Sequence, residues 1–338
     1  MGQLLNKQII ISLSLCLFLS NSFSQNLHNY VDTKIGSKDN GLESGYTFVG
    51  AAYPFGMLQF TPSFFSPNKG FVVTQLSGAG CPNMGNFPVL AISGEIKESP
   101  NKMDKFSPYK SINESEAGLM SVEMNDGTEI SVTTTKRTAV AKFKFNKSEI
   151  GSVIIGSGIN STTVKHAFVT KNSAKSCEGY AIGGDFCGSD TNYPLYFYAE
   201  FDRPSIDSRL WKKNKITTNK SVEGPNSGAI FTFDTSENKE VNYKISISYI
   251  SIDNAKMNMQ SENFGFIFQS YLSKNQACWN DKLGTIMVSN DDKDSLIQFY
   301  TSFYRSLIHP NIVSDVNGEY LGADFKIYNT SSGKNQYS

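Results

Sequence analysis

The sequence predicts a mainly β fold, a large antiparallel β-sandwich, with helices near its C-terminal end. From about residue 27 to residue 252, short apolar runs alternate with polar residues at a period of two. Clusters of Gly, Asn, Ser and Pro separate these runs, as turns do. After Asp253 the apolar period changes to about 3.6, the period of a helix. Many short strands at such spacing favour one large sandwich.

The strands are expected where the alternation is clearest. The runs are residues 128–132, 141–145, 193–201, 230–233 and 245–249, of which 193–201 is the longest and the richest in aromatic residues. Apolar side chains at every second position suit strands that have one buried and one exposed face.

Two helices are expected near residues 260–283 and 293–309. The apolar positions at helical spacing are Phe264, Phe268, Tyr271, Leu272 and Trp279, then Leu296, Phe299, Tyr300, Phe303 and Leu307. Pro310 ends the second helix. Each stripe covers one helix face, so each helix needs a surface to pack on.

The sequence of residues 46–88 differs from that of a typical core strand. Small residues, prolines and aromatics alternate there, and Gly78 and Gly80 flank Ala79. Glycine permits positive φ or the close approach of a ligand to the backbone. The segment therefore predicts two shaped loops, which are common places for binding sites.

Four groups of residues carry a resemblance to a known family. They are Gly50-Ala51-x-x-Pro54-Phe55-Gly56-Met57 with Leu76-Ser77-Gly78-x-Gly80-Cys81, residues 196–204, Phe299-Tyr300-Thr301-x-x-Tyr304, and His309-Pro310-Asn311 with Ser314-Asp315-Val316-x-Gly318-x-Tyr320. In this order they resemble glycoside hydrolase family 92, whose members are calcium-dependent, inverting exo-α-mannosidases. The family often has His before Leu-Ser-Gly, whereas this chain has Gln75, which forms hydrogen bonds but does not titrate.

The resemblance implies a division of the chain. We expect a signal peptide at 1–24, an N-terminal β-sandwich domain at 25–255, a helical linker at 256–290 and the truncated start of an (α/α)6 catalytic domain at 291–338. The family's general acid, its catalytic base and most of its calcium environment lie in the barrel beyond the position of Ser338. We therefore expect no catalytic residue and no bound calcium in this segment, and no activity of the segment alone.

The resemblance also implies where sugar would bind. In the family, loops of the sandwich reach the barrel mouth and help form the sugar pocket. The expected substrate-binding residues are Thr47, Phe48, Gln75, Ser77, Gly78, Gly80 and Cys81. Phe48 would offer an apolar face to a pyranose ring, and Gln75, Ser77 and backbone amides would meet its hydroxyl groups. The alternative is that Gly78-Ala79-Gly80 only permits tight packing between domains.

Carboxylates elsewhere in the chain have simpler interpretations. An inverting glycosidase needs two carboxyl groups that flank the scissile bond with room for a water molecule. Asp185, Asp190, Glu200 and Asp202 are available. Glu200 and Asp202 stand next to Arg203, which favours an ion pair at a turn, so we do not assign them as acid and base.

The residues Asp315-x-Asn317-Gly318 resemble the start of a calcium loop, but the later bidentate Glu is missing, so we expect a turn.

The N-terminus predicts export. Lys7 provides a positive start, residues 9–19 are apolar but too short to cross a bilayer, and Ser22-Phe23-Ser24 provides a small-x-small cleavage site. The alternative is a buried N-terminal helix. We expect a periplasmic or extracellular protein without a membrane span.

Charge and cysteine content limit the partners. The chain has 31 basic and 31 acidic residues and no basic run, so it lacks the electrostatic footprint of a nucleic-acid-binding protein. Oxidising surroundings permit disulfides. Cys177 and Cys187 are close enough in sequence to bridge a loop, and free buried thiols are the alternative.

Three functions compete at this point. The first is the N-terminal part of an exported α-mannosidase that hydrolyses terminal α-linked mannose, with α-1,2 linkages expected and mannose-containing glycans as partners. The second is a non-catalytic carbohydrate-binding β-sandwich. The third is the product of an interrupted gene, without function. The nucleotides that follow the codon of Ser338 would distinguish them.

Overall fold

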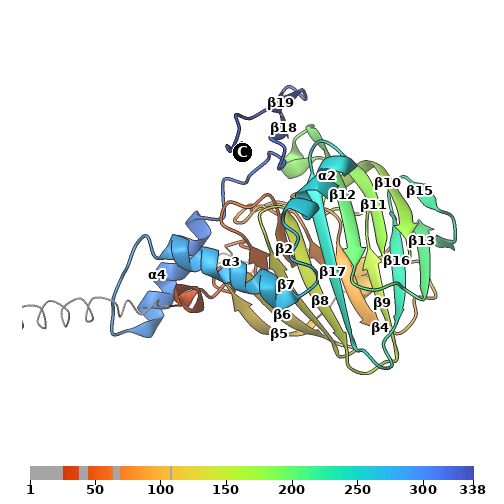
Figure 1. Ribbon diagram of the computed structural model, residues 1–338, viewed down its shortest axis with the longest axis horizontal. Helices are drawn as coiled ribbons and strands as arrows, with labels where there is room; N and C mark the ends of the chain where they lie inside the picture. Colours follow the sequence, from red (N-terminus) through yellow and green to blue (C-terminus); the bar gives the residue numbers. More distant parts are fainter. Residues whose placement is uncertain (1–25, 38–44, 64–68, 107–108) are drawn as a thin grey trace, which may run out of the picture.

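The computed structural model describes residues 26–37, 45–63, 69–106 and 109–338. Two large antiparallel sheets stack on each other, and three α-helices lie beside them (Figure 1). The expectation of a mainly β sandwich followed by helices is confirmed. The expected signal peptide lies outside the described residues. Within them, no helix is long and apolar enough to cross a membrane.

The first sheet has eight strands and contains the segment expected as shaped loops. Its strands, in spatial order, are β1 (Ala51–Ala52), β2 (Gln59–Pro62), β3 (Phe71–Val72), β4 (Val89–Ser93), β9 (Ile150–Ile155), β16 (Ser227–Asp234), β13 (Asp207–Lys212) and β14 (Lys215–Thr217). The prediction of loops over residues 46–88 is wrong in part, because three strands of two to four residues interrupt them. Strands this short leave no alternating pattern to recognise.

The second sheet has nine strands. They are, in order, β15 (Ser221–Glu223), β10 (Thr163–Ser173), β11 (Ser176–Gly184), β12 (Asn192–Phe201), β17 (Glu240–Ser248), β8 (Thr138–Phe145), β7 (Thr128–Thr134), β6 (Leu119–Met124) and β5 (Tyr109–Glu116). Four of the five runs predicted from alternation lie wholly in strands of the two sheets, and the fifth, 245–249, extends one residue beyond the end of β17. The 3-10 turns η1 (Leu27–Tyr30), η2 (Met103–Lys105) and η3 (Phe186–Gly188) lie in the connections.

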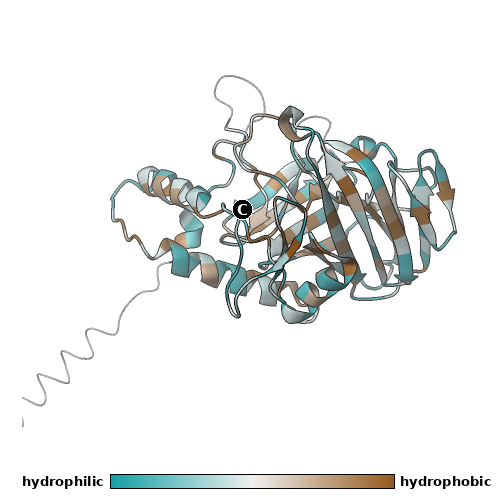
Figure 2. Ribbon diagram, turned by 90° about the horizontal axis from the view of Figure 1, so that it is seen from above, coloured by the Kyte–Doolittle hydropathy of each residue, from teal (hydrophilic) through white to brown (hydrophobic). Residues whose placement is uncertain are grey.

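The main core lies between the two sheets. On β12, Leu195, Phe197, Ala199 and Phe201 point inward and are at most 1% exposed, whereas the residues that alternate with them are half-buried. The ring of Phe201 lies 4.9 Å from that of Phe231 on β16, so it joins the two sheets. This alternation appears as brown and teal bands along the strands in Figure 2. Burying large aromatic side chains between the sheets supplies much of the driving force for folding.

The helical part differs from the expectation in one respect. There are three helices, α2 (Ile252–Ser261), α3 (Phe268–Leu283) and α4 (Lys293–Ser306), instead of two. Ser251 caps α2 by accepting a hydrogen bond from the N–H of Asn254 at 3.1 Å. Phe264 lies between α2 and α3, and the expected boundary between residues 255 and 256 falls inside α2.

The helices α3 and α4 pack against the N-terminal segment. The buried members of this second cluster are Leu27, Val31, Phe48, Ala52, Ala117, Trp279, Leu283, Tyr300, Tyr304 and Ile308. The indole Nε1 of Trp279 donates to the carbonyl oxygen of Ala52 at 2.9 Å, and its ring lies 4.3 Å from that of Tyr304. The first strand is therefore fixed to the helices by both packing and a hydrogen bond.

Arg137 fixes the C-terminal segment, which contains the hairpin β18 (Glu319–Leu321) and β19 (Ile327–Asn329). Its guanidinium donates from Nε to the carbonyl oxygen of Ser314 and from Nη2 to Oδ1 of Asn335, each at 2.9 Å. Its Nη1 lies 3.5 Å from a carboxylate oxygen of Glu262. One buried cation thus connects the turn between β7 and β8, the residue after α2 and the C-terminal segment.

Candidate functional site

The two loops that the sequence singled out lie side by side. The N–H of Gly78 donates to the carbonyl oxygen of Tyr46 at 2.8 Å, and that of Thr47 donates to the oxygen of Gly36 at 3.1 Å. Gly78 has a φ of +82°, which favours glycine, and a Cβ added at Gly80 would meet the Tyr46 ring at an ordinary contact distance of 3.8 Å. The structure thus brings all seven predicted site residues into one region, while their substrate-binding role stays a prediction.

Gln75 is the least satisfied residue of this region. Its backbone N–H donates to Oε1 of Gln59 at 3.0 Å, and its side chain is fully buried. Within the described residues, neither Nε2 nor Oε1 of Gln75 has a hydrogen-bond partner. A buried polar group without a partner costs about 1–3 kcal/mol, so the amide retains capacity for an ordered water molecule, which could in turn contact a ligand.

His309 joins the loop to the end of the helical part. Its Nε2 accepts the N–H of Ser77 at 3.2 Å, and its Nδ1 lies 2.7 Å from Oδ1 of Asn311. This arrangement suits a neutral ring that carries its proton on Nδ1. Burial lowers the pKa of His309, and the hydrogen bond to Asn311 partly opposes this shift. In the sequence His309 is isolated, and the contact joins residues 232 positions apart, which explains why pattern analysis missed it.

The side-chain hydroxyl of Ser77, like the amide of Gln75, is a buried polar group without a hydrogen-bond partner among the described residues. Two unpaired polar groups thus stand two residues apart on one loop. Together they supply a donor and acceptors of the kind that sugar hydroxyl groups require.

Phe48 does not offer a ring face to a sugar in this structure. It is 1% exposed and belongs to the second cluster, where α3 and α4 pack on the N-terminal segment. The expectation of an apolar platform is corrected on this physical ground, because a buried ring cannot stack on a pyranose. Phe48 instead packs in the second cluster, where it helps to hold the loop on the helices α3 and α4.

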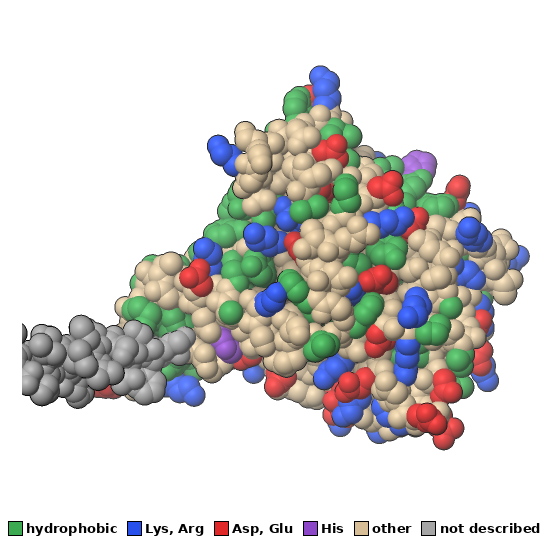
Figure 3. Space-filling view, in the orientation of Figure 1, with side chains coloured by type: hydrophobic (Ala, Val, Ile, Leu, Met, Phe, Trp, Pro, Cys, Tyr) green, Lys and Arg blue, Asp and Glu red, His purple; other side chains and the backbone are tan. Residues whose placement is uncertain are grey.

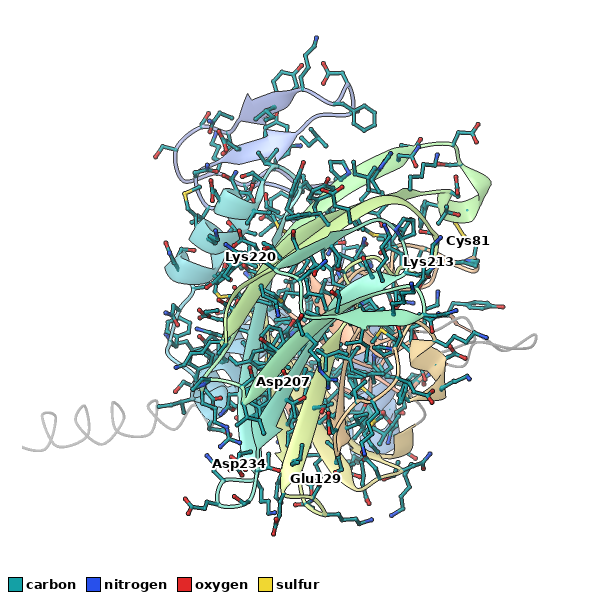
Figure 4. All side chains as sticks on the ribbon, turned by 90° about the vertical axis from the view of Figure 1, so that its right-hand side faces the viewer. Cys81, Glu129, Asp207, Lys213, Lys220 and Asp234 are labelled. Atoms are coloured by element: carbon teal, nitrogen blue, oxygen red, sulfur yellow. A yellow bond between two sulfur atoms is a disulfide. The ribbon has the colours of Figure 1, made fainter. Side chains whose placement is uncertain are left out.

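A disulfide between Cys81 and Cys187 fixes the far end of the loop, with a distance of 5.5 Å between the two Cα atoms. The bond is drawn beside the label of Cys81 in Figure 4. Of the two alternatives for Cys177, pairing with Cys187 is therefore wrong, and a free buried thiol is found. The alternation of β11 turns Cys177 into the core, where it is free, while Cys187 lies in the exposed turn η3. Burial raises the pKa of the Cys177 thiol, so it is unreactive.

A buried polar network lies under the loop. Oδ1 of Asn86 accepts from Oγ1 of Thr74 at 2.7 Å and from the hydroxyl of Tyr193 at 2.8 Å. Nδ2 of Asn86 donates to Oδ1 of Asn160 at 3.1 Å. Burial raises the pKa of Tyr193, so its hydroxyl stays protonated and donates. The network joins both sheets beneath the loop and holds its base rigid.

The carboxylates near the end of β12 have structural partners. Glu200 lies 2.8 Å from Nζ of Lys244, its neighbour in the register of β17, and Lys244 is fully buried. Oδ2 of Asp202 accepts from Nδ2 of Asn242 at 2.8 Å. Arg203 donates to the carbonyl oxygen of Asn238 at 2.9 Å. The expected ion pair exists, but its cation is Lys244 and not Arg203, because strand pairing decides it.

Asp315 forms a turn and not a calcium site. The N–H of Gly318 donates to its carbonyl oxygen at 2.9 Å, which confirms the turn. Its carboxylate is buried and accepts from Oγ of Ser248 at 2.6 Å and from the side-chain amides of Asn254 and Asn258 at 2.8 and 2.6 Å. Burial raises the pKa of Asp315, and these hydrogen bonds oppose the shift. N–H donors surround the carboxylate where calcium would require oxygen ligands, so the residues present do not fit the ion.

The described residues contain no group of three His, Cys, Asp or Glu side chains placed to hold a metal ion. Two surface hollows, of about 480 and 500 Å³, lie at the β13–β14 hairpin and share no lining residue with the loop pair.

Comparisons with known proteins identify both parts of the chain. Residues 30–248 match the Glycosyl hydrolase family 92 N-terminal domain, and residues 254–338 match the Glycosyl hydrolase family 92 catalytic domain. A comparison with curated proteins finds no match.

Solved structures give the same result. The family GH92 α-mannosidase BT3965 from Bacteroides thetaiotaomicron has a TM-score of 0.82 and 26% identity, over 93% of this chain and 45% of its own. Its complex with mannoimidazole has a TM-score of 0.82 and 25% identity, over 93% and 44%. The inverting mannosidase BT2199 from the same organism has a TM-score of 0.77 over 94% and 44%, and at 20% identity it shows the fold alone. The chain spans less than half the length of these proteins. Because both family domains match in order over nearly all of the described residues, the chain belongs to glycoside hydrolase family 92.

Proposed function

We propose that residues 25–338 supply the N-terminal half of an exported α-mannosidase that removes terminal α-linked mannose, with α-1,2 linkages as its substrates. Membership of the family supports this proposal, together with the 25% identity to an α-mannosidase whose complex with mannoimidazole has been solved. The inverting, calcium-dependent mechanism belongs to the same proposal and rests on the family alone.

The loop pair is proposed as one wall of the mannose site. The observation that carries this role is the buried amide of Gln75, which has no partner within the described residues, beside the equally unpaired hydroxyl of Ser77. Because Gln75 is 0% exposed, a sugar hydroxyl would reach its amide through an ordered water molecule, which would satisfy the amide and recover its desolvation cost. The disulfide of Cys81 and the contact between Ser77 and His309 support the loop in one conformation. Pre-organisation of this kind lowers the entropic cost of binding.

The segment alone is proposed to be inactive. Of the carboxylates considered as acid and base, Glu200 and Asp202 are engaged in structural contacts. Asp185 and Asp190 lie in sequence beside Cys187, which the disulfide joins to the loop at Cys81, and no role as acid or base is assigned to them. Inverting hydrolysis needs a proton donor and a water-activating base, and loss of one such group costs orders of magnitude in rate. Calcium dependence would then reside in residues beyond this segment, because Asp315 does not fit the ion.

The test is an activity assay on the purified chain with aryl α-mannoside and α-1,2-mannobiose, with and without a chelator. We expect no mannose release in either condition. Release that a chelator abolishes would contradict the proposed inactivity and would place acid, base and calcium within residues 25–338. The same assay on the product of the longer reading frame, if the codons after Ser338 continue into the barrel, should show chelator-sensitive release of mannose with inversion.

The competing function is a carbohydrate-binding module without catalysis. It is favoured by the same unpaired amide, since binding does not require an acid and a base. A coding region that ends in an intergenic gap, combined with mannose binding by the chain, would support this alternative.

Export is tested by N-terminal sequencing of the secreted product, which should begin near Gln25, and Met1 in that fraction would contradict it.

A further inference from the structure

The segment that follows α4, residues 307–312, bonds to both loops of the loop pair. In the first loop, residues 46–57, the N–H of Phe55 donates to the carbonyl oxygen of Leu307 at 3.0 Å. The N–H of Ile312 donates in turn to the carbonyl oxygen of Phe55, also at 3.0 Å. The first loop is therefore held by backbone bonds on both sides of the segment.

The second loop, residues 75–82, is held differently. Side chains accept three consecutive backbone N–H groups there. These are the N–H of Gln75, accepted by Oε1 of Gln59 at 3.0 Å, that of Leu76, accepted by Oδ1 of Asn83 at 2.9 Å, and that of Ser77, accepted by Nε2 of His309 at 3.2 Å. An amide oxygen always accepts, whereas an imidazole nitrogen accepts only when it carries no proton. Of the three bonds, the one to His309 therefore depends on a tautomer.

The side chain of Asn311 selects that tautomer. Its Nδ2 donates to the carbonyl oxygen of Gly56 at 2.7 Å and to that of Ile308 at 3.3 Å. Because carbonyl oxygens only accept, the amide cannot be turned over without the loss of both bonds. Its Oδ1 therefore faces Nδ1 of His309 at 2.7 Å and requires a proton on that nitrogen. In a neutral ring, Nε2 is then bare and able to accept the N–H of Ser77.

The electrostatic surroundings leave this choice to the hydrogen bonds. Burial and the hydrogen bond to Asn311 are the two causes of the shift in the pKa of His309, and no charged neighbour is among them. The chain is neutral overall, and the face in Figure 3 shows positive and negative side chains interspersed. Long-range charge therefore gives the ring little bias toward either protonation state.

We propose that Asn311 is a positioning residue for mannose, because it holds His309 in the tautomer that accepts the N–H of Ser77 and so fixes the second loop. This role rests on the proposed mannose site, since it acts through Ser77 and the neighbouring Gln75. Asn311 need not touch the sugar. Its bond to Gly56 holds the first loop as well, so one amide sets the spacing of the two loops. A loop that is ordered before the ligand arrives lowers the entropic cost of binding.

The first measurement concerns the ring itself, by proton–nitrogen NMR of the imidazole nitrogens in the purified chain at pH 7.5. The signals that disappear in His309→Gln belong to His309. We expect a protonated Nδ1 and a bare Nε2 in the wild type, and loss of this preference in Asn311→Ala. Hydrogen exchange of the Ser77 N–H should be about tenfold faster in Asn311→Ala, as expected for the loss of one bond. Unchanged ring signals or unchanged exchange would overturn the proposal.

A second variant, Asn311→Asp, separates the tautomer from packing. It keeps an oxygen that accepts from Nδ1 but adds a negative charge, which raises the pKa of His309. At pH 8 we expect slower exchange of the Ser77 N–H than in Asn311→Ala. As the pH falls, protection should be lost at a higher pH than in the wild type, because the imidazolium carries a proton on Nε2 also. A side chain that only fills space would not shift this profile, so identical profiles would contradict the proposal.

Titration with mannoimidazole connects the position of the loop to binding. Asn311→Ala should bind about tenfold more weakly than the wild type. The control is Asn219→Ala, on the exposed connection between β14 and β15, which should bind as the wild type does. Urea denaturation shows whether Asn311→Ala is folded, and if it is not, the profile of Asn311→Asp decides.

The outcomes distinguish the positioning role from the mannose site. Equal affinity of the wild type and of Asn311→Ala would overturn the positioning role and leave the mannose site standing. The opposite case is a wild-type chain that binds no mannoimidazole, while the ring signals and the exchange of the Ser77 N–H change as expected. That result would contradict the mannose site and still support the control of the loop by Asn311.

Discussion

At the scale of single residues, the role of Phe48 can be decided by its effect on stability. The ring is 1% exposed in the second cluster, so Phe48→Ala should lower the free energy of unfolding by about 3–5 kcal/mol, through lost burial and the cavity left behind. Urea denaturation measures this change. Phe325→Ala is the control, since Phe325 is 57% exposed and its loss should change stability by less than about 0.5 kcal/mol. Unchanged stability with lost sugar binding would restore the ring as a sugar platform.

His309 predicts a pH dependence of stability. Burial lowers the pKa of the ring from its ordinary value of 6.5, so the unfolded chain binds a proton more readily than the folded one. The stabilisation is therefore fully present above about pH 6.5 and is lost as the pH falls through that value toward the lowered pKa. In His309→Gln, unfolding experiments between pH 5 and 7.5 should show a smaller loss of stability on acidification than in the wild type. An identical pH profile would contradict the buried, neutral state of the ring.

The sequence could name the residues of the loop but not their partners. Gly78 was recognisable because a flanked glycine indicates positive φ, and φ is +82° there. The neighbours of Gln75 and Ser77 were invisible, since His309 comes from the far end of the chain. The burial of Phe48 was invisible for the same reason, because its cluster contains α3 and α4. Long-range packing, not local pattern, decides which aromatic residue is free to meet a ligand.

At the scale of elements, the disulfide from Cys81 to Cys187 ties the loop to the connection after β11. It closes a segment of 106 residues, so the Cys81→Ser/Cys187→Ser variant should lose about 2–5 kcal/mol of stability. Dithiothreitol should lower the melting temperature of the wild type and leave that of the variant unchanged. Cys278→Ser, which removes a free thiol, is the control. Equal melting of oxidised and reduced wild-type protein would show that the loop does not depend on the bond.

Elements with regular periodicity could be predicted, and short ones could not. The strands β7, β8, β12, β16 and β17 have clear alternation and were found. The strands β1 to β3 have two to four residues each, too few for a period to show. The separate helix α2 was missed because its buried positions include Asn254 and Asn258, whose amides bind the carboxylate of Asp315. Polar burial of this kind breaks the apolar stripe on which helix prediction depends.

At the scale of the whole molecule, the sandwich and the helical part form one structure. Trp279 joins α3 to the first strand, and Arg137 joins the turn between β7 and β8 to the C-terminal segment. The loop pair lies where these parts meet, since Ser77 on the loop contacts His309 after α4. A sugar site at this junction would depend on the correct folding of both the sandwich and the helical part. For this reason the candidate site could not be assembled from the N-terminal domain alone.

The most direct test of the mannose site is a titration of the purified chain with mannoimidazole, in which ligand-observed NMR measures binding. We predict saturable binding by the wild type, and binding at least about tenfold weaker in Gln75→Ala, the loss expected for one buried hydrogen bond. Gln269→Ala is the control, because Gln269 lies on the exposed side of α3 and bonds only to Ser273 among the described residues. It should bind as the wild type does. No saturable binding by the folded wild-type chain, or equal affinity in Gln75→Ala, would contradict the assignment of the loop pair to a mannose site.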